Sequence, residues 1–364
     1  MKKLGFGLMR LPMLDGEIDI EQVKQMVDVF MENGFTYFDT AYGYHGGKSE
    51  VAAKAALVDR YPRESFQLAT KLPAWNAADA EAARQMLYTS LERTGAGYFD
   101  YYLLHNLGGT RTDVFDNYDL WSFVHEQKEK GVIRKLGFSF HDTADKLEEV
   151  LKAHPEVDFV QLQINYADWE SVSVQSRLCY EVARKYNKPI IIMEPVKGGA
   201  LANLMPEIAK PMTDMAPDMS QSSWALRFAA SLEGVMMVLS GMSNIAQMKD
   251  NVSFMSDFKP LTDAEYAAID EVRELLKKTD HVPCTNCQYC VKDCPQSVRI
   301  PGIFESLNIK KMYNNMTGAQ NHYNFVTSKG GKACDCIACG QCESVCPQHI
   351  NIIEALRESS ELFD

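Results

Sequence analysis

Short apolar runs alternate with amphipathic stretches from the start of the chain to about residue 258. Eight of the runs lack polar alternation, which is typical of strands in a parallel sheet buried on both faces. The predicted strands are Leu4–Met9, Thr36–Asp39, Phe66–Lys71, Phe99–His105, Ile133–Ser139, Phe159–Gln163, Ile190–Met193 and Met236–Ser240. Helical spacing lies between them, in Ile20–Asn33, Ala78–Thr94, Tyr118–Lys130, Thr143–Lys152 and Val174–Tyr186.

A strand–helix unit repeated eight times indicates an α/β fold of the (β/α)8 TIM barrel type. The 364 residues suffice for such a barrel, which takes about 250, and for a smaller appended domain. Apolar residues make up 46% of the chain, so a large core can be buried. A doubly wound sheet is the alternative, but no G-x-G-x-x-G follows the first predicted strand.

The last part of the chain carries one cysteine pattern twice, C-x2-C-x2-C-x3-C-P. The two copies are Cys284, Cys287, Cys290, Cys294–Pro295 and Cys336, Cys339, Cys342, Cys346–Pro347. Bacterial ferredoxins hold [4Fe–4S] clusters with this run, and the fourth cysteine of each copy ligates the other cluster. By that resemblance, one cluster would use Cys284, Cys287, Cys290 and Cys346. The other would use Cys336, Cys339, Cys342 and Cys294.

Zinc and disulfides are the alternative uses of these cysteines. Zinc also binds C-x2-C pairs, but it needs only four ligands per site and has no use for the full repeated run. A disulfide framework would require an oxidising compartment, and we expect no signal peptide. The pattern therefore predicts two [4Fe–4S] clusters and a chain suited to electron transfer.

The domain boundary is predicted near residue 280. A helix is expected over Thr262–Lys278, and Asp280–Pro283 follows it as a hinge. Residues 1–280 would then form the barrel with a trailing helix, and residues 281–364 a 4Fe–4S ferredoxin-type domain. The segments Ile303–Tyr313 and Ile350–Leu362 have helical spacing, so the second domain is expected to be small and mostly helical.

Charge and hydropathy limit the environment of the chain. Its formal net charge of −12 argues against nucleic acid as a partner. The first residues lack the apolar stretch and cleavage site of a secretion signal. No run approaches the roughly 20 apolar residues that a membrane helix requires. We expect a cytoplasmic protein without a membrane or nucleic-acid partner.

Four polar side chains lie at or just after the ends of predicted strands. Asp39 ends the second strand and Tyr44 follows five residues later, while Lys71 ends the third and His105 the fourth. Barrel enzymes place their chemistry at the carboxyl ends of the strands, so these side chains should share one rim. The segments D-T-A-x-x-Y, T-K and L-L-H, in this order, resemble the aldo/keto reductase family over roughly residues 4–258.

The resemblance implies an oxidoreductase that reduces a small-molecule carbonyl compound, with Tyr44 as general acid. A phenol with its usual pKa of about 10 is a sluggish acid–base at neutral pH. We expect the Lys71 ammonium to lower that pKa, Asp39 to hold Lys71 charged, and His105 to orient the carbonyl oxygen. Each residue alone could be structural, but consistent roles in one site favour catalysis. Tyr42 is the competing phenol; the family spacing favours Tyr44.

The same resemblance implies NADP or NAD as cofactor. The implied contacts are Ser139, Gln161, Met193, Gly241, Ser243, Gln247 and Asn251. This chain departs from the family at several of these positions. Phe140 replaces an asparagine, with His141 as a candidate substitute, and Met193 replaces the aromatic residue that stacks on nicotinamide. Gly241 and Gln247 stand where NADP-preferring members often have lysine and arginine.

A hydride carries two electrons together, whereas each cluster passes one at a time. The clusters could be structural or regulatory beside ordinary carbonyl reduction, or they could exchange electrons with a partner ferredoxin or another redox protein. Alternatively, the altered pocket could hold another redox cofactor. In that reading the chain is an electron-transfer protein between a ferredoxin-type partner and a non-nicotinamide cofactor or substrate in the barrel.

Overall fold

The computed structural model describes residues 2–172, 174–284, 286, 288–292, 294–346 and 348–364. The chain divides into two compact units. The first consists of Met1–Pro195 and Ser222–Thr262, and the second of Val196–Gln221 and Asp263–Asp364. The second unit therefore includes a segment that precedes the last strand of the first.

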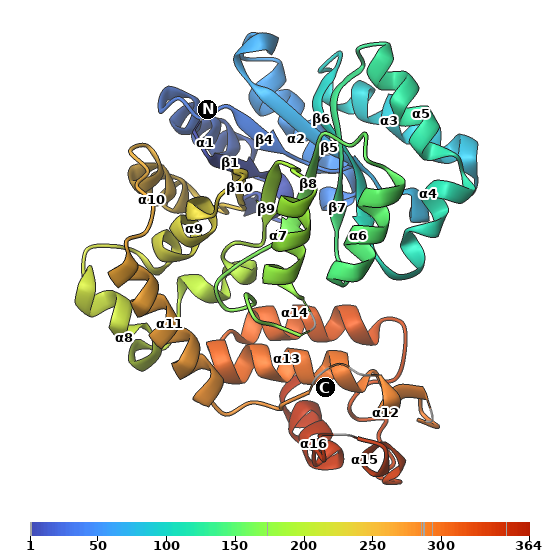
Figure 1. The fold of residues 1–364 in the computed structure, drawn as a ribbon, viewed down its shortest axis with the longest axis vertical. Helices are drawn as coiled ribbons and strands as arrows, with labels where there is room; N and C mark the ends of the chain where they lie inside the picture. The colour runs from blue at the N-terminus through green and yellow to red at the C-terminus, as the bar shows by residue number, and fades with distance from the viewer. Residues whose placement is uncertain (1, 173, 285, 287, 293, 347) are drawn as a thin grey trace. The chain divides into compact units, whose positions relative to one another are not determined.

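The first unit is built on a closed barrel of eight parallel strands, in the order β1-β10-β9-β8-β7-β6-β5-β4 (Figure 1). The strands are β1 (Leu4–Gly7), β4 (Tyr37–Asp39), β5 (Gln67–Leu72), β6 (Phe99–Leu107), β7 (Ile133–Phe140), β8 (Phe159–Gln163), β9 (Ile190–Met193) and β10 (Val235–Ser240). The predicted barrel is confirmed, and closure excludes the doubly wound alternative.

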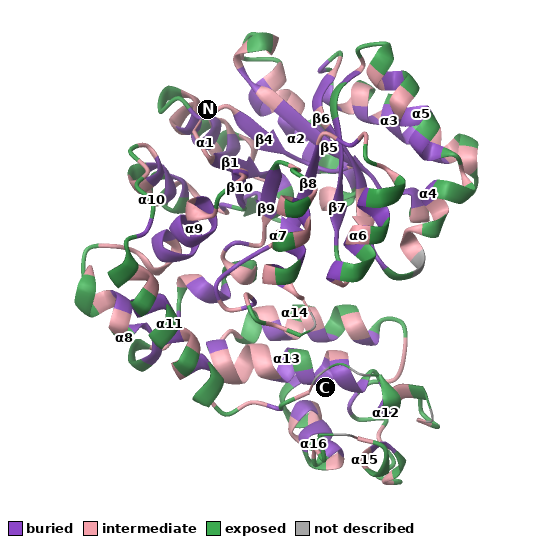
Figure 2. Ribbon diagram, viewed as in Figure 1, coloured by how far each residue is buried: buried purple, intermediate pink, exposed green. Residues whose placement is uncertain are grey.

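Helices follow the strands and cover the outside of the barrel (Figure 1). They include α1 (Ile20–Glu32), α2 (Lys48–Ala53), α3 (Ala80–Thr94), α4 (Asp113–Asn117), α5 (Leu120–Glu129), α6 (Ala144–Ala153), α7 (Ser176–Lys185), α9 (Gln221–Ser231) and α10 (Ile245–Met255). Figure 2 shows the strands as almost wholly buried, as expected when a sheet is covered on both faces.

The barrel interior is filled by side chains from alternate strand positions. Tyr37, Leu103, Phe159 and Met237 form one contiguous buried cluster there. Gly137 on β7 lies so close to Phe159 that a Cβ atom would stand 2.6 Å from the Phe159 carbonyl oxygen. The strand therefore needs glycine at this position to let the Phe159 ring enter the barrel.

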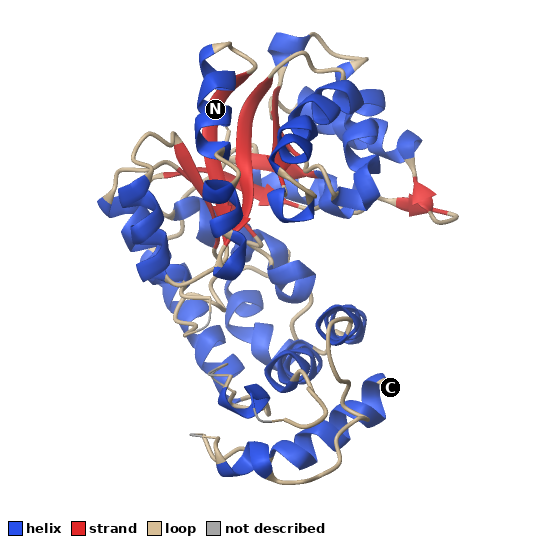
Figure 3. Cartoon of the chain, turned by 90° about the vertical axis from the view of Figure 1, so that its right-hand side faces the viewer, coloured by secondary structure: helices blue, strands red, loops and turns tan. Residues whose placement is uncertain are grey.

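A small antiparallel hairpin, β2 (Met13–Leu14) and β3 (Glu17–Ile18), precedes α1 and is drawn as short red arrows in Figure 3. This hairpin was not among the elements predicted from the sequence. Asp15 and Gly16 both have positive φ, of 51° and 84°, as the favoured two-residue hairpin turn requires. The Asp-Gly pair was the signal that could have identified this hairpin.

The second unit is helical. It contains α8 (Pro206–Met215), α11 (Asp263–Lys278), α12 (Tyr289–Lys292), α13 (Ile300–Tyr313), α14 (Met316–Thr327), α15 (Gln341–Ser344) and α16 (Ile352–Phe363). Both helices expected after the cysteine runs are present, so the predicted helical fold of this region is confirmed. Among the described residues, no helix is long and apolar enough to span a membrane.

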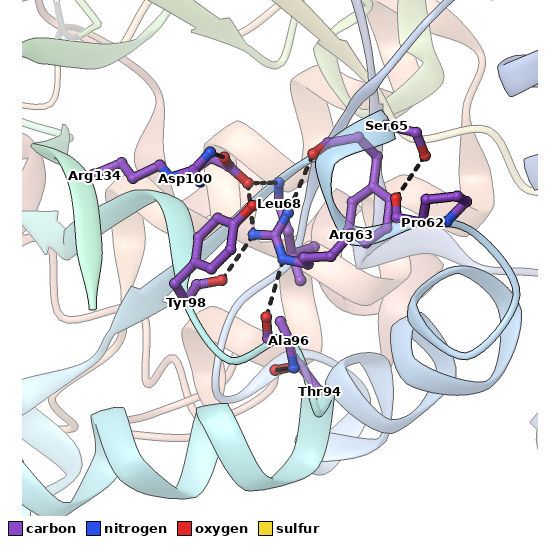
Figure 4. Close-up of polar contacts among 10 residues, drawn as sticks. Pro62, Arg63, Ser65, Leu68, Thr94, Ala96, Tyr98, Asp100 and Arg134 are labelled. Atoms are coloured by element: carbon purple, nitrogen blue, oxygen red, sulfur yellow. Dashed lines mark hydrogen bonds and ion pairs between the residues drawn. The ribbon is translucent and has the colours of Figure 1, made fainter. Parts of the chain in front are cut away.

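Asp100 organises the end of the barrel at which the strands begin (Figure 4). Its carboxylate pairs with Arg63 at 2.7 Å and Arg134 at 3.0 Å, and it accepts the Leu68 backbone N–H at 3.0 Å. Each of the two guanidiniums lies 3.8 Å from the centre of the Tyr98 ring. Asp100 is buried, so the two cations and the ring depend on one carboxylate.

We expect Asp100→Ala to destabilise the first unit by about 3 kcal/mol, because removing one partner of a buried ion pair leaves the others uncompensated. Urea denaturation followed by circular dichroism measures this loss. Glu92, exposed on α3, provides the control: Glu92→Ala should change stability by less than about 0.5 kcal/mol. Equal stability of the two variants would contradict a structural role for Asp100.

Candidate functional site

The four side chains expected at the barrel rim come from three neighbouring strands and the turn after the first of them. Asp39 is the last residue of β4, Lys71 lies in β5 and His105 in β6. These strands pair in that order, with Asp39 beside Ala69 and Lys71 beside Leu103. Tyr44 begins a short 3-10 helix, Tyr44–Gly47, that follows β4.

Lys71 connects the predicted set. Its ammonium donates to the Asp39 carboxylate, to the Thr40 carbonyl oxygen at 2.8 Å and to the Tyr44 hydroxyl at 3.4 Å. Gln161 on β8 donates to the other oxygen of Asp39 at 3.2 Å. Burial disfavours the ammonium, but the charges of Asp39 and Tyr44 and their hydrogen bonds to Lys71 together outweigh burial, so the pKa of Lys71 is raised. Lys71 is therefore a buried cation with a fixed counterion.

The pKa of Tyr44 differs from the sequence expectation. Burial raises this pKa, and the positive charge of Lys71 lowers it by less than burial raises it. The pKa therefore lies above its usual value instead of below it, because a phenolate at this position would lose more hydration than Lys71 returns. At neutral pH Tyr44 is a protonated phenol that can give a proton.

His105 lies beside the phenol. Its ring centre is 6.0 Å from that of Tyr44 and 5.4 Å from that of Trp75, which follows β5. Burial, reinforced by the charges of Lys71, His141 and Arg111, holds the pKa of His105 well below its usual value. Its Nδ1 atom is buried and has no hydrogen-bond partner among the described residues. His105 is therefore a neutral imidazole at neutral pH.

The competing phenol, Tyr42, has a different environment. The Arg93 guanidinium lies 4.3 Å from the centre of the Tyr42 ring and donates to the Tyr42 carbonyl oxygen at 3.0 Å. Arg93 also pairs at 3.2 Å with Glu50, whose carboxylate is fully buried. The Glu50 carboxylate accepts a hydrogen bond of 2.7 Å from the Thr70 hydroxyl. These contacts direct Tyr42 towards Arg93, whereas Tyr44 contacts Lys71.

Arg93 and Glu50 were not identified from the sequence. They fix the segment between Asp39 and Tyr44 and the residue before Lys71, so they position the site without entering it. Gly47, with φ of 91°, brings the backbone so close that a Cβ atom would stand 2.9 Å from the Arg93 guanidinium. The Gly-Gly-Lys-Ser-Glu segment, which ends in Glu50, was the sequence signal that could have pointed to these two residues.

Two of the predicted nicotinamide contacts are direct neighbours. Ser139 on β7 pairs in register with Gln161 on β8, and both are buried. The Ser139 hydroxyl accepts the Asn106 backbone N–H at 2.7 Å. The Phe140 ring lies 6.3 Å from that of Phe138, in the layer outside the strands. Phe140 therefore cannot take the role of the family's asparagine.

His141, the proposed substitute for that asparagine, lines a pocket of about 120 Å³ on the outer side of β7 and β8, with Asp142, Gln163 and Cys179 among its neighbours. His141 is exposed. The pocket is lined by Phe140 and Leu162, whose strand neighbours Ser139 and Gln161 belong to the barrel interior. His141 is thus placed beside the predicted cofactor contacts, at the same end of the strands.

Met193 is the last residue of β9, and Gly241 directly follows β10. Gly241 lies against Arg10: a Cβ atom there would stand 3.3 Å from the Arg10 side chain. Arg10 also pairs at 3.5 Å with Glu194, the residue after Met193. The structure thus brings a cation to the loop in which the sequence offered no lysine or arginine. Arg10 is distant in sequence, so only the closed barrel places it there.

The remaining candidate nucleotide contacts, Ser243, Gln247 and Asn251, form hydrogen bonds within the segment that follows β10 or to the last residue of that strand. Asn244 caps α10 by accepting the Gln247 backbone N–H at 2.9 Å, and the Gln247 side chain accepts the Ser243 N–H at 2.7 Å. The buried Asn251 donates to the Ser240 hydroxyl at 2.8 Å. Ser243 and Gln247 are held at the rim, while the Asn251 amide holds the loop to the end of β10.

The cysteines gather in two pockets of the second unit. One pocket is lined by Cys284 and Cys290 from the first run and Cys346 from the second, with Phe304 and Ile352 beside them. The other is lined by Cys336, Cys339 and Cys342 from the second run and Cys294 from the first. Cys287 lies outside the described residues. Each pocket therefore draws thiols from both runs.

Both pockets suit a cluster by the chemistry of their donors. Each presents soft thiols against apolar side chains, and Cys290 and Cys342 are buried in the core of this unit. Among the described side chains, no group of three or more potential ligands is arranged to hold a single metal ion. Cys334 is exposed, and Cys179 is buried in the first unit with its pKa raised by burial to about 12.

Comparison with known proteins agrees with this architecture. Residues 3–274 match the model of the aldo/keto reductase family, and residues 283–351 match that of a 4Fe-4S dicluster domain. An aldo-keto reductase of Mycolicibacterium vanbaalenii is 27% identical over 71% of this chain and 86% of its own length. The NADH-specific methylglyoxal reductase of Escherichia coli is 24% identical over 76% of this chain and 96% of its own.

Solved structures share the barrel. The holo form of an aldo-keto reductase from Bacillus halodurans superposes with a TM-score of 0.56 at 23% identity, over 74% of this chain and 91% of that one. An aldo-keto reductase from Klebsiella pneumoniae in complex with NADPH gives a TM-score of 0.60 at 20% identity, over 74% and 90%. The chain belongs to the aldo/keto reductase family of oxidoreductases and carries a 4Fe-4S dicluster domain after its barrel.

Proposed function

We propose that the protein is an NAD(P)H-linked reductase of an aldehyde or ketone, with Tyr44 as general acid and two [4Fe–4S] clusters bound in its helical unit. The observation that carries the proposal is the contact of Lys71 with both Asp39 and the Tyr44 hydroxyl. A lone buried ion pair would be structural. A phenol on the same ammonium, beside a neutral imidazole, is arranged for proton transfer to a carbonyl oxygen.

The residues at the rim fit a nicotinamide cofactor. Ser139 and Gln161 present a hydroxyl and an amide side by side, and Arg10 supplies a cation beside Gly241. Relatives in the family include a protein named as NADH-specific and one solved with NADPH, which supports NAD(P)H without deciding between the two forms. Glu194 pairs with Arg10 and offsets its charge, which weakens any preference for the extra phosphate of NADPH.

Each residue of the site has a separate role in the reduction. When bound, NAD(P)H supplies the hydride that adds to the carbonyl carbon. Neutral His105 orients the carbonyl oxygen, and the Tyr44 hydroxyl gives its proton to that oxygen as its negative charge develops. Lys71 stabilises the resulting phenolate, while Asp39 and Gln161 hold Lys71 in position. A proton from solvent then restores Tyr44, so each turnover consumes one hydride and one proton.

The cysteine pockets support ligation across the two runs. Cys346 would complete the cluster held by Cys284, Cys287 and Cys290. Cys294 would complete the cluster held by Cys336, Cys339 and Cys342. Such clusters supply one-electron exchange. Cys339 is exposed, which favours exchange with an external redox protein such as a ferredoxin.

That exposure favours a second candidate function, electron transfer between a ferredoxin-type partner and a non-nicotinamide cofactor or substrate in the barrel. The two functions differ in one experiment. Protein purified without oxygen should oxidise NADH or NADPH when an aldehyde is added, in a one-to-one ratio with the alcohol formed. The absence of such oxidation with both nucleotides, while a reduced ferredoxin still reduces the clusters, would favour the electron-transfer protein.

A further inference from the structure

The loop after β6 brings a guanidinium to the end of the barrel that carries Asp39, Tyr44, Lys71 and His105. A 3-10 helix, Gly109–Arg111, follows the strand, and Arg111 is partly buried. The Arg111 Nε–H donates to the Asn106 carbonyl oxygen at 2.9 Å. Asn106 directly follows His105 in β6, so this bond ties the base of the guanidinium to the strand that carries the catalytic imidazole.

The loop is held in one conformation by several contacts. Gly108 has φ of 146° and passes so close to β7 that a Cβ atom would stand 2.4 Å from the His141 carbonyl oxygen. Its N–H donates to the Thr112 hydroxyl at 3.0 Å, and the Gly109 N–H donates to Asp142 at 2.7 Å. A guanidinium on so constrained a loop is preorganised.

The remaining N–H groups of Arg111 have no acidic partner within the described ranges of the chain. Among the residues that the structure describes, no carboxylate oxygen lies within 4.0 Å of this guanidinium. Asp142, the acid that holds the loop, uses its second oxygen for the Thr143 backbone N–H at 2.8 Å. By contrast, Arg63 and Arg177 pair with carboxylates at 2.7 and 2.9 Å.

The charge of Arg111 also reaches the site. It is one of the charges that, after burial and Lys71, hold the pKa of His105 below its usual value. Lys71 itself is neutralised by Asp39, whereas Arg111 has no such counterion in the part of the chain that the structure describes. A partly buried guanidinium without a carboxylate partner among the described residues, at the carboxyl end of the barrel strands, is suited to bind an anion.

We propose that Arg111 binds the carboxylate of an anionic carbonyl substrate, so that the preferred substrates are oxo acids or carboxylated aldehydes. The inference rests on the proposed carbonyl reduction. A planar guanidinium with two N–H groups on one edge matches a carboxylate in a two-point contact. Binding the carboxylate at Arg111 would present the carbonyl group to His105 and Tyr44.

Matched aldehydes with and without a carboxylate test this assignment. The rates to compare are kcat/KM for 4-carboxybenzaldehyde against 4-methylbenzaldehyde, and for 4-oxobutanoate against butanal, with saturating NADH or NADPH. The wild type should prefer at least one of the carboxylated aldehydes by about tenfold or more. Arg111→Gln should lower kcat/KM for that aldehyde by about 10- to 100-fold and change the neutral one by less than about twofold.

Two further variants separate charge from structure. Arg111→Lys should keep part of the preference, because it keeps the charge but not the two-point geometry. Lys152→Gln, which removes an exposed charge from α6, should keep all of it. Equal losses for charged and neutral aldehydes in Arg111→Gln, or a wild type that prefers the neutral ones, would overturn the assignment. Absence of NAD(P)H oxidation with all four aldehydes would instead count against the proposed function.

Discussion

Tyr44→Phe should lower kcat for carbonyl reduction by about 10²- to 10⁴-fold, the usual contribution of a positioned general acid. The substitution removes one hydroxyl and keeps the ring, so the packing beside His105 should persist. Binding of NAD(P)H, measured by fluorescence titration, should change little, and the absorbance of the clusters should be unchanged. Steady-state rates of aldehyde reduction under anaerobic conditions measure the effect.

Tyr42→Phe is the matched control. It removes the other phenol of the same segment, whose ring lies against Arg93, and should leave kcat within about twofold. If Tyr42→Phe abolished reduction and Tyr44→Phe did not, the assignment of the general acid would be wrong. If neither changed kcat, neither Tyr42 nor Tyr44 would be the general acid.

The pH dependence of the wild type provides an independent check on the same site. Because burial raises the pKa of Tyr44 above its usual value, the acid stays protonated through neutral and mildly alkaline pH. Because the pKa of His105 is lowered, the imidazole stays neutral below its usual titration range. We therefore expect kcat/KM for reduction to be level from about pH 6 to 9 and to fall above about pH 10.

Cys294→Ala should remove about four of the eight irons expected for two clusters. The lost cluster should be the one bound by the second run, although Cys294 belongs to the first. Cys294 lines the same pocket as Cys336, Cys339 and Cys342. Removing the Cys294 thiol therefore leaves that cluster with three protein thiolates. Iron and sulfide analysis of anaerobically purified protein measures the loss.

Double variants identify which cluster is lost. Cys294→Ala combined with Cys336→Ala should lose no more iron than either alone, because both thiols serve one cluster. Cys294→Ala combined with Cys284→Ala should lose both clusters. Cys334→Ala is the control and should retain all the iron, since its thiol does not line the cysteine pockets. Additive iron loss in the first pair would contradict ligation across the runs.

The parts of the fold that sequence could predict depend on short-range patterns. Apolar strands such as Ile190–Met193 indicated a parallel sheet covered on both faces, and the eightfold repeat of strand and helix indicated that this sheet closes into a barrel. Asp39, Lys71 and His105 could be assigned to one site because parallel strands end at the same rim. The spacing of the family motif D-T-A-x-x-Y then added Tyr44 to the same site.

What sequence could not predict depends on partners distant in the chain. Arg93 meets Glu50 and Tyr42 across more than 40 positions, and Arg10 meets Glu194 only because β1 closes the barrel beside β10. The pKa of Tyr44 was expected with the wrong sign for a related reason. A linear pattern names the neighbouring charge, Lys71, but not the amount of water that folding removes from the phenol.

The division of the chain into two units has a consequence for dissecting the protein. The helical unit takes residues 196–221, which include α8, from a point before the last strand of the barrel. No single truncation can therefore separate the two units intact. Cutting at any one peptide bond leaves one of them incomplete, so isolating the cluster-binding part would require grafting two non-adjacent stretches of the gene into one reading frame.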